Sequence, residues 1–392
     1  MNFDVVVIGA GAAGMMCAVE AGKRGRSVLV VDHAAAAGEK IRISGGGRCN
    51  FTNTRTSPSQ FISSNPRFAS SALRRYRPAD FIAWIDRHGI AHHEKTLGQR
   101  FCDGSAKEVI AMLLGEMAQA GVVLRLRTSV TAIEREDQCF ALTLSDGQKV
   151  RAMSVVVATG GKSIPKMGAT GYGYEVARQF GLGLVDTRPG LVPLTFEPRT
   201  LEPLKALAGV SVEAVVGCGK TRFPEAMLFS HRGLSGPAIL QISSYWREGG
   251  EIEVAMASGV DVLAFLKAAR TDRARQSPLT VLSDLLPRRL AQAVLEPMSL
   301  AGNMADQPNR VLEAINAAVN AWTLKPVGSE GYRTAEVTLG GVDTDELDPR
   351  TMEAREVPGL YFIGEVVDVT GWLGGYNFQW AWSSGWCAGQ AV

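Results

Sequence analysis

Residues 3–16 read FDVVVIGAGAAGMM, and this stretch decides the fold. Its first part, residues 3–8, is a β-branched run that predicts a strand, and the glycines after it lead into a helical pattern over residues 15–24. Residues 27–31 (SVLVV) predict a second strand. A strand, a glycine turn, a helix and another strand within about thirty residues form the βαβ unit of a parallel sheet. The sequence therefore predicts an α/β protein with a Rossmann-type domain.

The glycines of this stretch fit the pattern GxGxxG, in which each glycine has its own role. Gly9 permits the tight turn, Gly11 lets backbone N–H groups approach a pyrophosphate, and Gly14 allows the helix to pack closely on the strand. Asp32 ends the second strand, where a carboxylate accepts hydrogen bonds from ribose hydroxyls and repels a 2′-phosphate. Together these residues predict a dinucleotide site.

Three later stretches indicate which dinucleotide is bound. Residues 155–161 (VVVATGG) predict a strand whose small terminal residues run beside a cofactor, and residues 361–365 (YFIGE) predict a strand ending in a glycine and an acid that can bind ribityl or ribose hydroxyls. Residues 371–379 (GWLGGYNFQ) predict a turn and a helix start whose N–H groups face the negative charge that develops on a reduced flavin. These elements, in this order at both ends of the chain, favour FAD over NAD.

The character of the sequence changes near Pro189 and again near Thr334. Between these positions lie short β-like pieces separated by Gly and Pro, and then long helical periodicity. We expect a discontinuous FAD-binding domain of residues 1–188 and 334–392. Inserted into it we expect a β-barrel-like domain of residues 189–260 and 322–333, and a helical domain of residues 261–321.

Composition gives no reason to expect nucleic acid or a membrane as a partner. The chain has 41 basic and 39 acidic residues, a net charge of +2. We interpret the local cluster of Arg74, Arg75 and Arg77 as a solvated helix face. Asp4 stands where a signal peptide would have a basic flank, and no segment is long and apolar enough to span a bilayer. The six cysteines show no CxxC pair and no zinc-ligand spacing, so we expect a cytoplasmic protein with reduced thiols and no metal site.

Longer motifs carry a resemblance that runs nearly end to end. They are residues 43–50 (ISGGGRCN) with 52–53, residues 158–161 with 168–173, residues 228–237 (LFSHRGLSGP), and residues 364–381. In these motifs the chain resembles the aminoacetone-oxidase-like FAD-binding flavoproteins, a family that also includes bile-acid 3-dehydro-Δ4,6-reductase-type proteins. The resemblance implies the three domains above, with the substrate entering where they meet the flavin. It also implies that the loop of residues 40–50 lines the cofactor.

The side chains of this loop suit a cofactor site. Lys40, Arg42 and Arg48 can offset the negative charge of a pyrophosphate or a reduced flavin, and the triple glycine lets the backbone approach closely. Cys49 has no second cysteine nearby in sequence, which favours a packing role over a redox role. The predicted FAD contacts are Gly9, Gly11, Ala12, Ala13, Gly14, Asp32, Lys40, Arg42, Ser44, Gly45, Gly46, Cys49, Asn50, Val130, Ala158, Thr159, Gly160, Gly161, Gly364, Glu365, Asp368, Gly374, Gly375, Tyr376, Asn377 and Phe378.

The candidate catalytic residues are His231 and Arg48. His231 lies in a loop that Gly233 and Gly236 bend, where it can act as a general acid or base, anchor a substrate, or have only a structural role. These features predict an FAD-dependent oxidoreductase that transfers hydride between non-covalently bound flavin and a small organic molecule. Only one nucleotide fingerprint is present, which argues against a reductase with two resident nucleotides. An oxidase of an amine-like substrate and a reductase supplied by transient NAD(P)H remain equally open, because the resemblance implies a family with both kinds of activity.

Two other hypotheses remain. One is a non-catalytic flavin-binding sensor that docks a partner through the helical insertion. The other is flavin-dependent modification of RNA, which predicts a basic face and a reactive cysteine, and the balanced charge argues against it. The oligomeric state is open.

Overall fold

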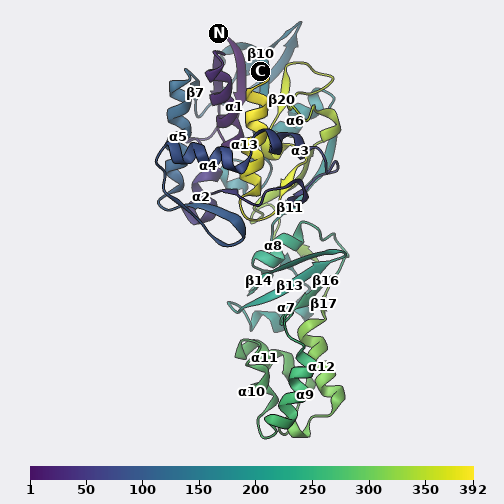
Figure 1. Ribbon diagram of the computed structural model, residues 1–392. Helices are drawn as coiled ribbons and strands as arrows, with labels where there is room; N and C mark the ends of the chain where they lie inside the picture. Colours follow the sequence, from purple (N-terminus) through teal and green to yellow (C-terminus); the bar gives the residue numbers. More distant parts are fainter. The chain divides into compact units, whose positions relative to one another are not determined.

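The computed structural model describes all 392 residues, which form two compact units (Figure 1). Unit 1 comprises Met1–Arg188 and Val337–Val392, and unit 2 comprises Pro189–Glu336. The finer division of the inserted region into a sheet domain and a helical domain remains our proposal.

A mostly parallel seven-stranded sheet forms the centre of unit 1. Its order is β7-β2-β1-β10-β9-β8, and β20 also pairs with β10. The pairs β1–β2, β1–β10, β10–β20 and β2–β7 are parallel, whereas β8 and β9 form an antiparallel edge. The bounds are β1 (Asn2–Ile8), β2 (Val28–Val31), β7 (Val123–Arg125), β8 (Val130–Glu136), β9 (Cys139–Leu144), β10 (Lys149–Val157) and β20 (Leu360–Phe362). Because α1 (Ala12–Lys23) connects β1 to β2, the predicted βαβ unit and the Rossmann-type α/β fold are confirmed.

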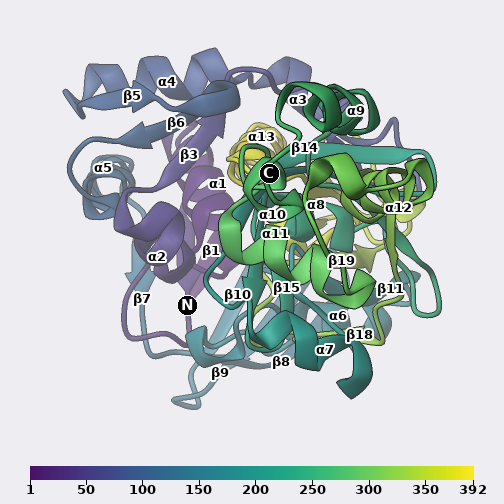
Figure 2. The same cartoon turned by 90° about the horizontal axis from the view of Figure 1, so that it is seen from below.

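The first and last helices of the chain pack side by side. Figures 1 and 2 both show α13 (Tyr376–Gly389) next to α1. A Cβ on Gly385 would stand 2.5 Å from the carbonyl oxygen of Ala13, and one on Gly389 would stand 2.8 Å from that of Cys17. Only glycine permits so close an approach of two helices, so both ends of the sequence are required to form one core.

Smaller elements complete unit 1. Residues 44–65 contain two short strands, β3 and β4, because β3 pairs with β6 and β4 pairs with β21. The remaining elements are α2 (Glu39–Gly47), β3 (Asn50–Asn53), β4 (Phe61–Ile62), α3 (Ala69–Arg75), α4 (Pro78–Arg87), β5 (His92–Glu94), β6 (Gln99–Cys102), α5 (Ala106–Gln119), α6 (Tyr172–Gln179), β11 (Leu184–Gly190), β19 (Val337–Val342) and β21 (Thr370–Gly371).

Unit 2 combines an antiparallel sheet with helices. Its seven strands follow the order β17-β16-β13-β14-β15-β12-β18. They are β12 (Leu194–Thr195), β13 (Ser211–Cys218), β14 (Thr221–Ser230), β15 (Gly233–Ser235), β16 (Ile252–Ala255), β17 (Trp322–Leu324) and β18 (Gly328–Ser329). The helices are α7 (Pro198–Lys205), α8 (Pro237–Ser243), α9 (Val262–Asp272), α10 (Pro278–Leu282), α11 (Arg288–Leu295) and α12 (Asn309–Asn320). None of the helices in either unit has the length and apolar character needed to cross a bilayer.

Candidate flavin site

The carboxyl ends of β1, β10 and β20 meet at one edge of the sheet of unit 1. The N–H of Ala158 donates to the carbonyl of Ile8 (2.9 Å), and the N–H of Ile363 donates to that of Val157 (3.1 Å). A Cβ on Gly9 would clash with the carbonyl oxygen of Ala158. The three strand ends predicted to run beside the cofactor are therefore in direct contact.

In the loop between β1 and α1, Gly14 and Gly11 have different surroundings, as the GxGxxG pattern predicts. A Cβ on Gly14 would clash with the carbonyl oxygen of Gly9, so Gly14 serves the packing of helix on strand. No atom lies within 4 Å of the position of a Cβ on Gly11, which begins α1 without a side-chain cap. The N–H groups of the first turn therefore face open space, which fits a bound pyrophosphate.

Asp32 fastens this loop to the end of β2. Its Oδ2 accepts a hydrogen bond from the N–H of Ala10 (2.6 Å), and its Oδ1 accepts one from the N–H of Ala34 (2.8 Å). Each carboxylate oxygen retains capacity for a further hydrogen bond, so the side chain can hold the loop and still accept from a ribose hydroxyl.

Glu365 and Lys40 form a largely buried ion pair beside the tip of β10. Lys40 Nζ lies 2.6 Å from Glu365 Oε2 and 2.7 Å from the hydroxyl of Ser163, and the N–H of Thr338 donates to Glu365 Oε1 (2.9 Å). Burial alone would raise the pKa of Glu365, but the ammonium of Lys40 and these hydrogen bonds outweigh it and lower the pKa. The positive charge of Lys40 is thus balanced by the carboxylate of Glu365, and a contact of Lys40 with FAD stays a prediction.

The triple glycine, which we call the triple-glycine loop, forms the C-terminal end of α2 and departs there from helical geometry into the left-handed conformation. The φ angles of Gly45, Gly46 and Gly47 are 56°, 66° and 85°, and no atom lies within 4 Å of a Cβ on Gly46. Such a run of N–H groups forms a concave surface suited to anions. Cys49 at its end has no exposed surface, and burial raises the pKa of its thiol. These findings favour the packing role for Cys49.

The C-terminal glycine turn lies against the N-terminal region. Asn53 Nδ2 donates to the carbonyl of Gly374 (2.9 Å), and a Cβ on Gly375 would stand 2.8 Å from Asn50 Oδ1. Gly375 begins α13 without a side-chain cap, and Asn377 is hydrogen-bonded to both the N–H and the carbonyl of Gly371 (2.8 Å each). The start of α13 thus lies at the same site as the segment that follows α2.

The remaining predicted residues divide into two groups. Thr159 lies at the tip of β10 with a buried hydroxyl that has no hydrogen-bond partner in the protein, which fits a polar cofactor. Val130 is packed in the core, and Asp368 accepts from the N–H of Ser64 (2.7 Å), so their contacts with FAD stay predictions. His231 lies on an exposed turn between β14 and β15 of unit 2, whereas every other predicted residue belongs to unit 1, and its catalytic role also stays a prediction.

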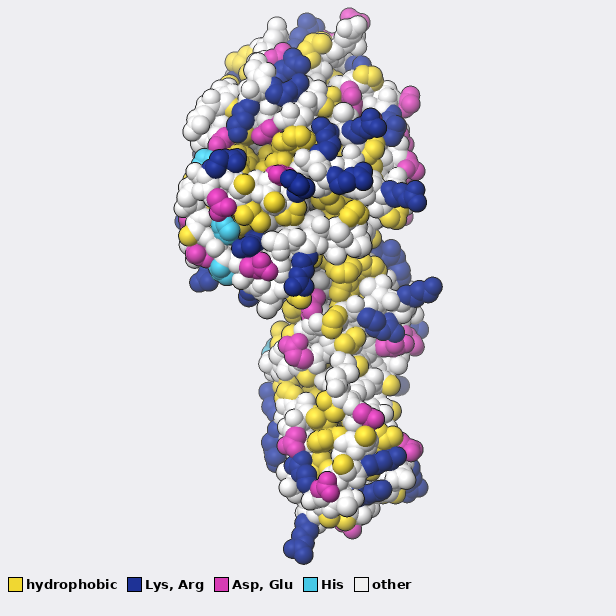
Figure 3. All heavy atoms as spheres, in the orientation of Figure 1, with side chains coloured by type: hydrophobic (Ala, Val, Ile, Leu, Met, Phe, Trp, Pro, Cys, Tyr) yellow, Lys and Arg dark blue, Asp and Glu magenta, His cyan; other side chains and the backbone are white.

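One charge pattern was missed in the sequence. Between Glu39 and Asp80 the chain contains no acidic residue but eight basic ones: Lys40, Arg42, Arg48, Arg55, Arg67, Arg74, Arg75 and Arg77. Six of them, Arg42, Arg48, Arg55, Arg67, Arg74 and Arg75, have no carboxylate within ion-pair distance. We call residues 40–79 the basic segment. Figure 3 shows Lys and Arg side chains distributed over the face of unit 1 that carries α3 and α4.

Fold and site together define an FAD-binding enzyme of the oxidoreductase type. The HI0933-like protein Rossmann domain matches residues 3–391, and the chain belongs to this HI0933-like family. It is 50% identical over 391 residues to the ribosomal RNA dihydrouridine synthase of Escherichia coli (strain K12), covering 99% of this chain and 98% of that protein. The ribosomal RNA dihydrouridine synthase of Haemophilus influenzae (strain ATCC 51907 / DSM 11121 / KW20 / Rd) is 43% identical over 394 residues (99% and 98%).

A third relative is more distant. The 3-dehydro-bile acid Δ(4,6)-reductase of Clostridium scindens (strain ATCC 35704 / DSM 5676 / VPI 13733 / 19) is 30% identical over 406 residues, covering 98% of both chains. The resemblance to bile-acid reductases is thus confirmed at the level of the family, whereas the aminoacetone-oxidase name stays a prediction.

The two ribosomal RNA relatives overturn two predictions. The main functional prediction, hydride transfer with a small organic molecule, is wrong, and so is the expectation that no nucleic acid is a partner. The physical reason is that the net charge of +2 is an average over the whole chain, which conceals the eight cations of the basic segment.

Proposed function

We propose that this protein reduces a uridine of ribosomal RNA to dihydrouridine with FAD as its cofactor. The observation that carries the proposal is the 50% identity to a ribosomal RNA dihydrouridine synthase across 99% of this chain and 98% of the relative. The reaction saturates the C5–C6 double bond of the uracil ring, which takes up two electrons and two protons. When bound in its reduced form, FAD would supply a hydride, which carries both electrons and one of the two protons, and is itself oxidised.

The geometry of unit 1 supports assigned roles for the residues around the cofactor. The N–H groups after Gly11 would bind the pyrophosphate, and Asp32 would hold the adenosine ribose. The N–H groups that open α13 would face the pyrimidine edge of the flavin and stabilise negative charge there. The ion pair of Lys40 and Glu365 would fix the segment after β10 beside the cofactor, because both partners are hydrogen-bonded to the hydroxyl of Ser163.

The basic segment supports RNA as the substrate. Arg42 and Arg48 flank the triple-glycine loop, and neither has a carboxylate partner to neutralise it. Unpaired guanidinium groups attract phosphates and bind them in a bidentate manner. We therefore propose that Arg48 contacts the RNA rather than the cofactor alone.

Two further parts of the reaction are also proposals. The flavin must be reduced again after each turnover, and we propose NAD(P)H as the electron donor. It would bind only transiently, because the chain has one nucleotide fingerprint and that site is assigned to FAD. Saturating C5 needs a proton, and Cys49 does not provide it, because its thiol has no exposed surface. His231 is exposed and remains a candidate proton donor.

The test is single-turnover reduction of ribosomal RNA. Purified holoprotein is reduced with dithionite under anaerobic conditions and mixed with ribosomal RNA from a strain that lacks the enzyme. We expect flavin reoxidation together with dihydrouridine, measured by mass spectrometry of the digested nucleosides. The Gly11→Leu variant is the control, because its side chain would occupy the pyrophosphate position and prevent FAD retention. Flavin that stays reduced, with no dihydrouridine formed, would contradict the proposal.

A further inference from the structure

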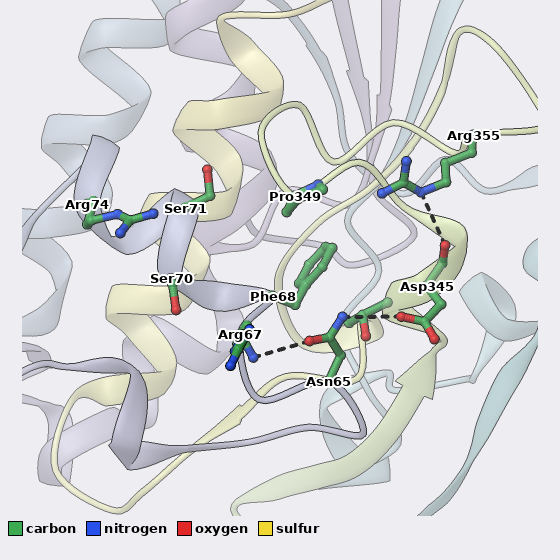
Figure 4. Close-up of a pocket in the computed structure, with 10 residues that line it drawn as sticks. Asn65, Arg67, Phe68, Ser70, Ser71, Arg74, Asp345, Pro349 and Arg355 are labelled. Atoms are coloured by element: carbon green, nitrogen blue, oxygen red, sulfur yellow. Dashed lines mark hydrogen bonds between the residues drawn. The ribbon is translucent and has the colours of Figure 1, made fainter.

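A surface pocket of about 400 Å³ lies in unit 1, outside the flavin site. Figure 4 shows Ser70, Ser71 and Arg74 of α3 on one side of it, and Pro349 and Arg355 on the other. Arg67 and Phe68, just before α3, lie between the two sides. The volume is within the range of small-ligand sites.

Three guanidinium groups give this pocket a positive charge. Arg67 and Arg74 are exposed, and their side chains form no hydrogen bond or ion pair with other residues. The Nε of Arg355 donates only to the backbone carbonyl of Asp345 (3.2 Å). All three groups therefore retain the forked donors that bind phosphate oxygens.

The carboxylates near the pocket leave this charge largely in place. Asp345 lines the pocket, and its Oδ1 accepts from Asn65 Nδ2 (3.2 Å). Glu346 and Asp348 are not among the lining residues, and their carboxylates accept from the N–H groups of Gly183 (3.1 Å) and Arg350 (2.7 Å). One carboxylate among three guanidinium groups suits a ribonucleotide, because the ribose 2′-hydroxyl can donate to it.

A buried hydroxyl points independently to a ligand. Thr344 lines the pocket and is 1% exposed, and its Oγ1 has no hydrogen-bond partner. A buried hydroxyl without a partner costs free energy, so such groups are rare unless a ligand or water completes them.

The pocket is joined to the flavin site through a pair of short strands. β4, which precedes Asn65, pairs with β21, with Thr370 opposite Ile62. β21 leads into the glycine turn that begins α13. The N–H of Ser64 also donates to Asp368 (2.7 Å). The pocket and the candidate flavin site thus belong to the same compact unit and are connected by backbone pairing.

We infer that this pocket binds a backbone phosphate of the ribosomal RNA substrate. Arg67, Arg74 and Arg355 grip the phosphate oxygens, and the Thr344 hydroxyl donates to the nucleotide. The pocket acts as a positioning site that adds affinity for the RNA without touching the reacting base. This inference rests on the proposed function.

The test compares the double variant Arg67→Gln/Arg74→Gln with Arg178→Gln. Arg178 is an exposed arginine of α6 that does not line the pocket, so it controls for the loss of a surface charge. Binding of labelled ribosomal RNA is measured against salt concentration, and dihydrouridine formation against RNA concentration. We expect the double variant to bind roughly tenfold more weakly, with the slope of log K against log[salt] reduced by about 1 to 1.5. KM for RNA should rise while kcat and FAD content stay at the wild-type values.

Thr344→Val is the second variant, since it keeps the shape of the side chain and removes the hydroxyl. It should fold as stably as the wild type or more so, because it removes an unsatisfied buried group, and it should bind RNA several-fold more weakly. A single-stranded DNA of the substrate sequence should lose less affinity than the RNA when Asp345 is changed to Asn.

The outcomes separate the two proposals. If wild-type protein reduces ribosomal RNA but the double variant and Thr344→Val match it in affinity, salt slope and KM, the pocket inference is wrong and the proposed function stands. If wild-type holoprotein neither binds nor reduces ribosomal RNA, the proposed function fails and the pocket inference fails with it. A higher KM for NAD(P)H in the double variant, with RNA binding unchanged, would assign the pocket to the electron donor and overturn the inference.

Discussion

Residues 1–39 and the basic segment, residues 40–79, follow one another in unit 1 but would meet anions in different ways. The first region presents backbone: Gly9 and Gly14 are in contact with other main-chain atoms, Gly11 faces open space, and no cation lies in the loop. The second region presents side chains, eight cations and no acid. Backbone donors fix one anion in one geometry, whereas flexible guanidinium groups can follow a long polyanion. The comparison separates the cofactor function of unit 1 from its proposed RNA function.

The largest loss of stability is expected from a substitution at Gly14, where the backbone of residues 1–39 is packed most tightly. Gly14→Ala would bring a Cβ into the carbonyl oxygen of Gly9, and neither backbone can move without displacing β1 or α1. We expect a loss of roughly 2–4 kcal/mol in the free energy of unfolding of the apoprotein, measured by urea denaturation.

Gly11→Ala is the matched control for that variant. Its φ of −84° suits alanine, and nothing lies within 4 Å of the new Cβ, so the apoprotein should be as stable as the wild type to within about 0.5 kcal/mol. Its affinity for FAD should nevertheless fall at least roughly tenfold, because the Cβ crowds the pyrophosphate. Equal destabilisation by both variants would contradict the division of roles between these glycines.

A smaller loss of stability is expected at the border of the two regions. Here Lys40, the first cation of the basic segment, is paired with Glu365. The folded-state pKa of Glu365 is lowered from its ordinary 4.5, so the pair stabilises the protein above about pH 4.5 and this contribution is lost as the pH falls below it. Glu365→Gln should cost about 1–2 kcal/mol at pH 7, because Lys40 is left unpaired but is partly solvated. The difference from wild type, measured by urea denaturation across pH 3–7, should shrink toward acid. A constant difference would contradict the assigned cause.

Much of the fold was predictable because its signals are local. The β-branched run of residues 3–8, the glycine pattern and the position of Asp32 are all explained by contacts within the first thirty-odd residues or with the next strand. The contact of both chain ends was inferred only from the order of the motifs. Its cause, the close approach of α1 to Gly385 and Gly389, is a tertiary contact that no local pattern displays.

Modification of RNA was considered as an alternative, and it was ranked below the main prediction for a different reason. A balanced total charge argues against nucleic acid only if charges are well mixed along the chain, and here they are not. Counting acids between residues 39 and 80 would have found the basic segment. The pocket could not have been found in this way. Arg355 and Thr344 are far from Arg67 and Arg74 in the sequence, and only the tertiary structure brings them to the same pocket.

The smallest change in stability is expected at Arg48, which lies in the basic segment next to the triple-glycine loop. Arg48 is exposed and has no carboxylate partner, so Arg48→Gln should change the free energy of unfolding by less than about 0.5 kcal/mol. If its charge serves the RNA, affinity for ribosomal RNA should fall several-fold, with the salt slope reduced by about 0.7 to 0.9, while FAD remains bound. Arg48→Lys keeps the charge and should restore most of the slope, although not the bidentate geometry. Loss of FAD with an unchanged RNA salt slope would instead assign Arg48 to the cofactor, and the separation between backbone and side-chain recognition would then not hold at this loop.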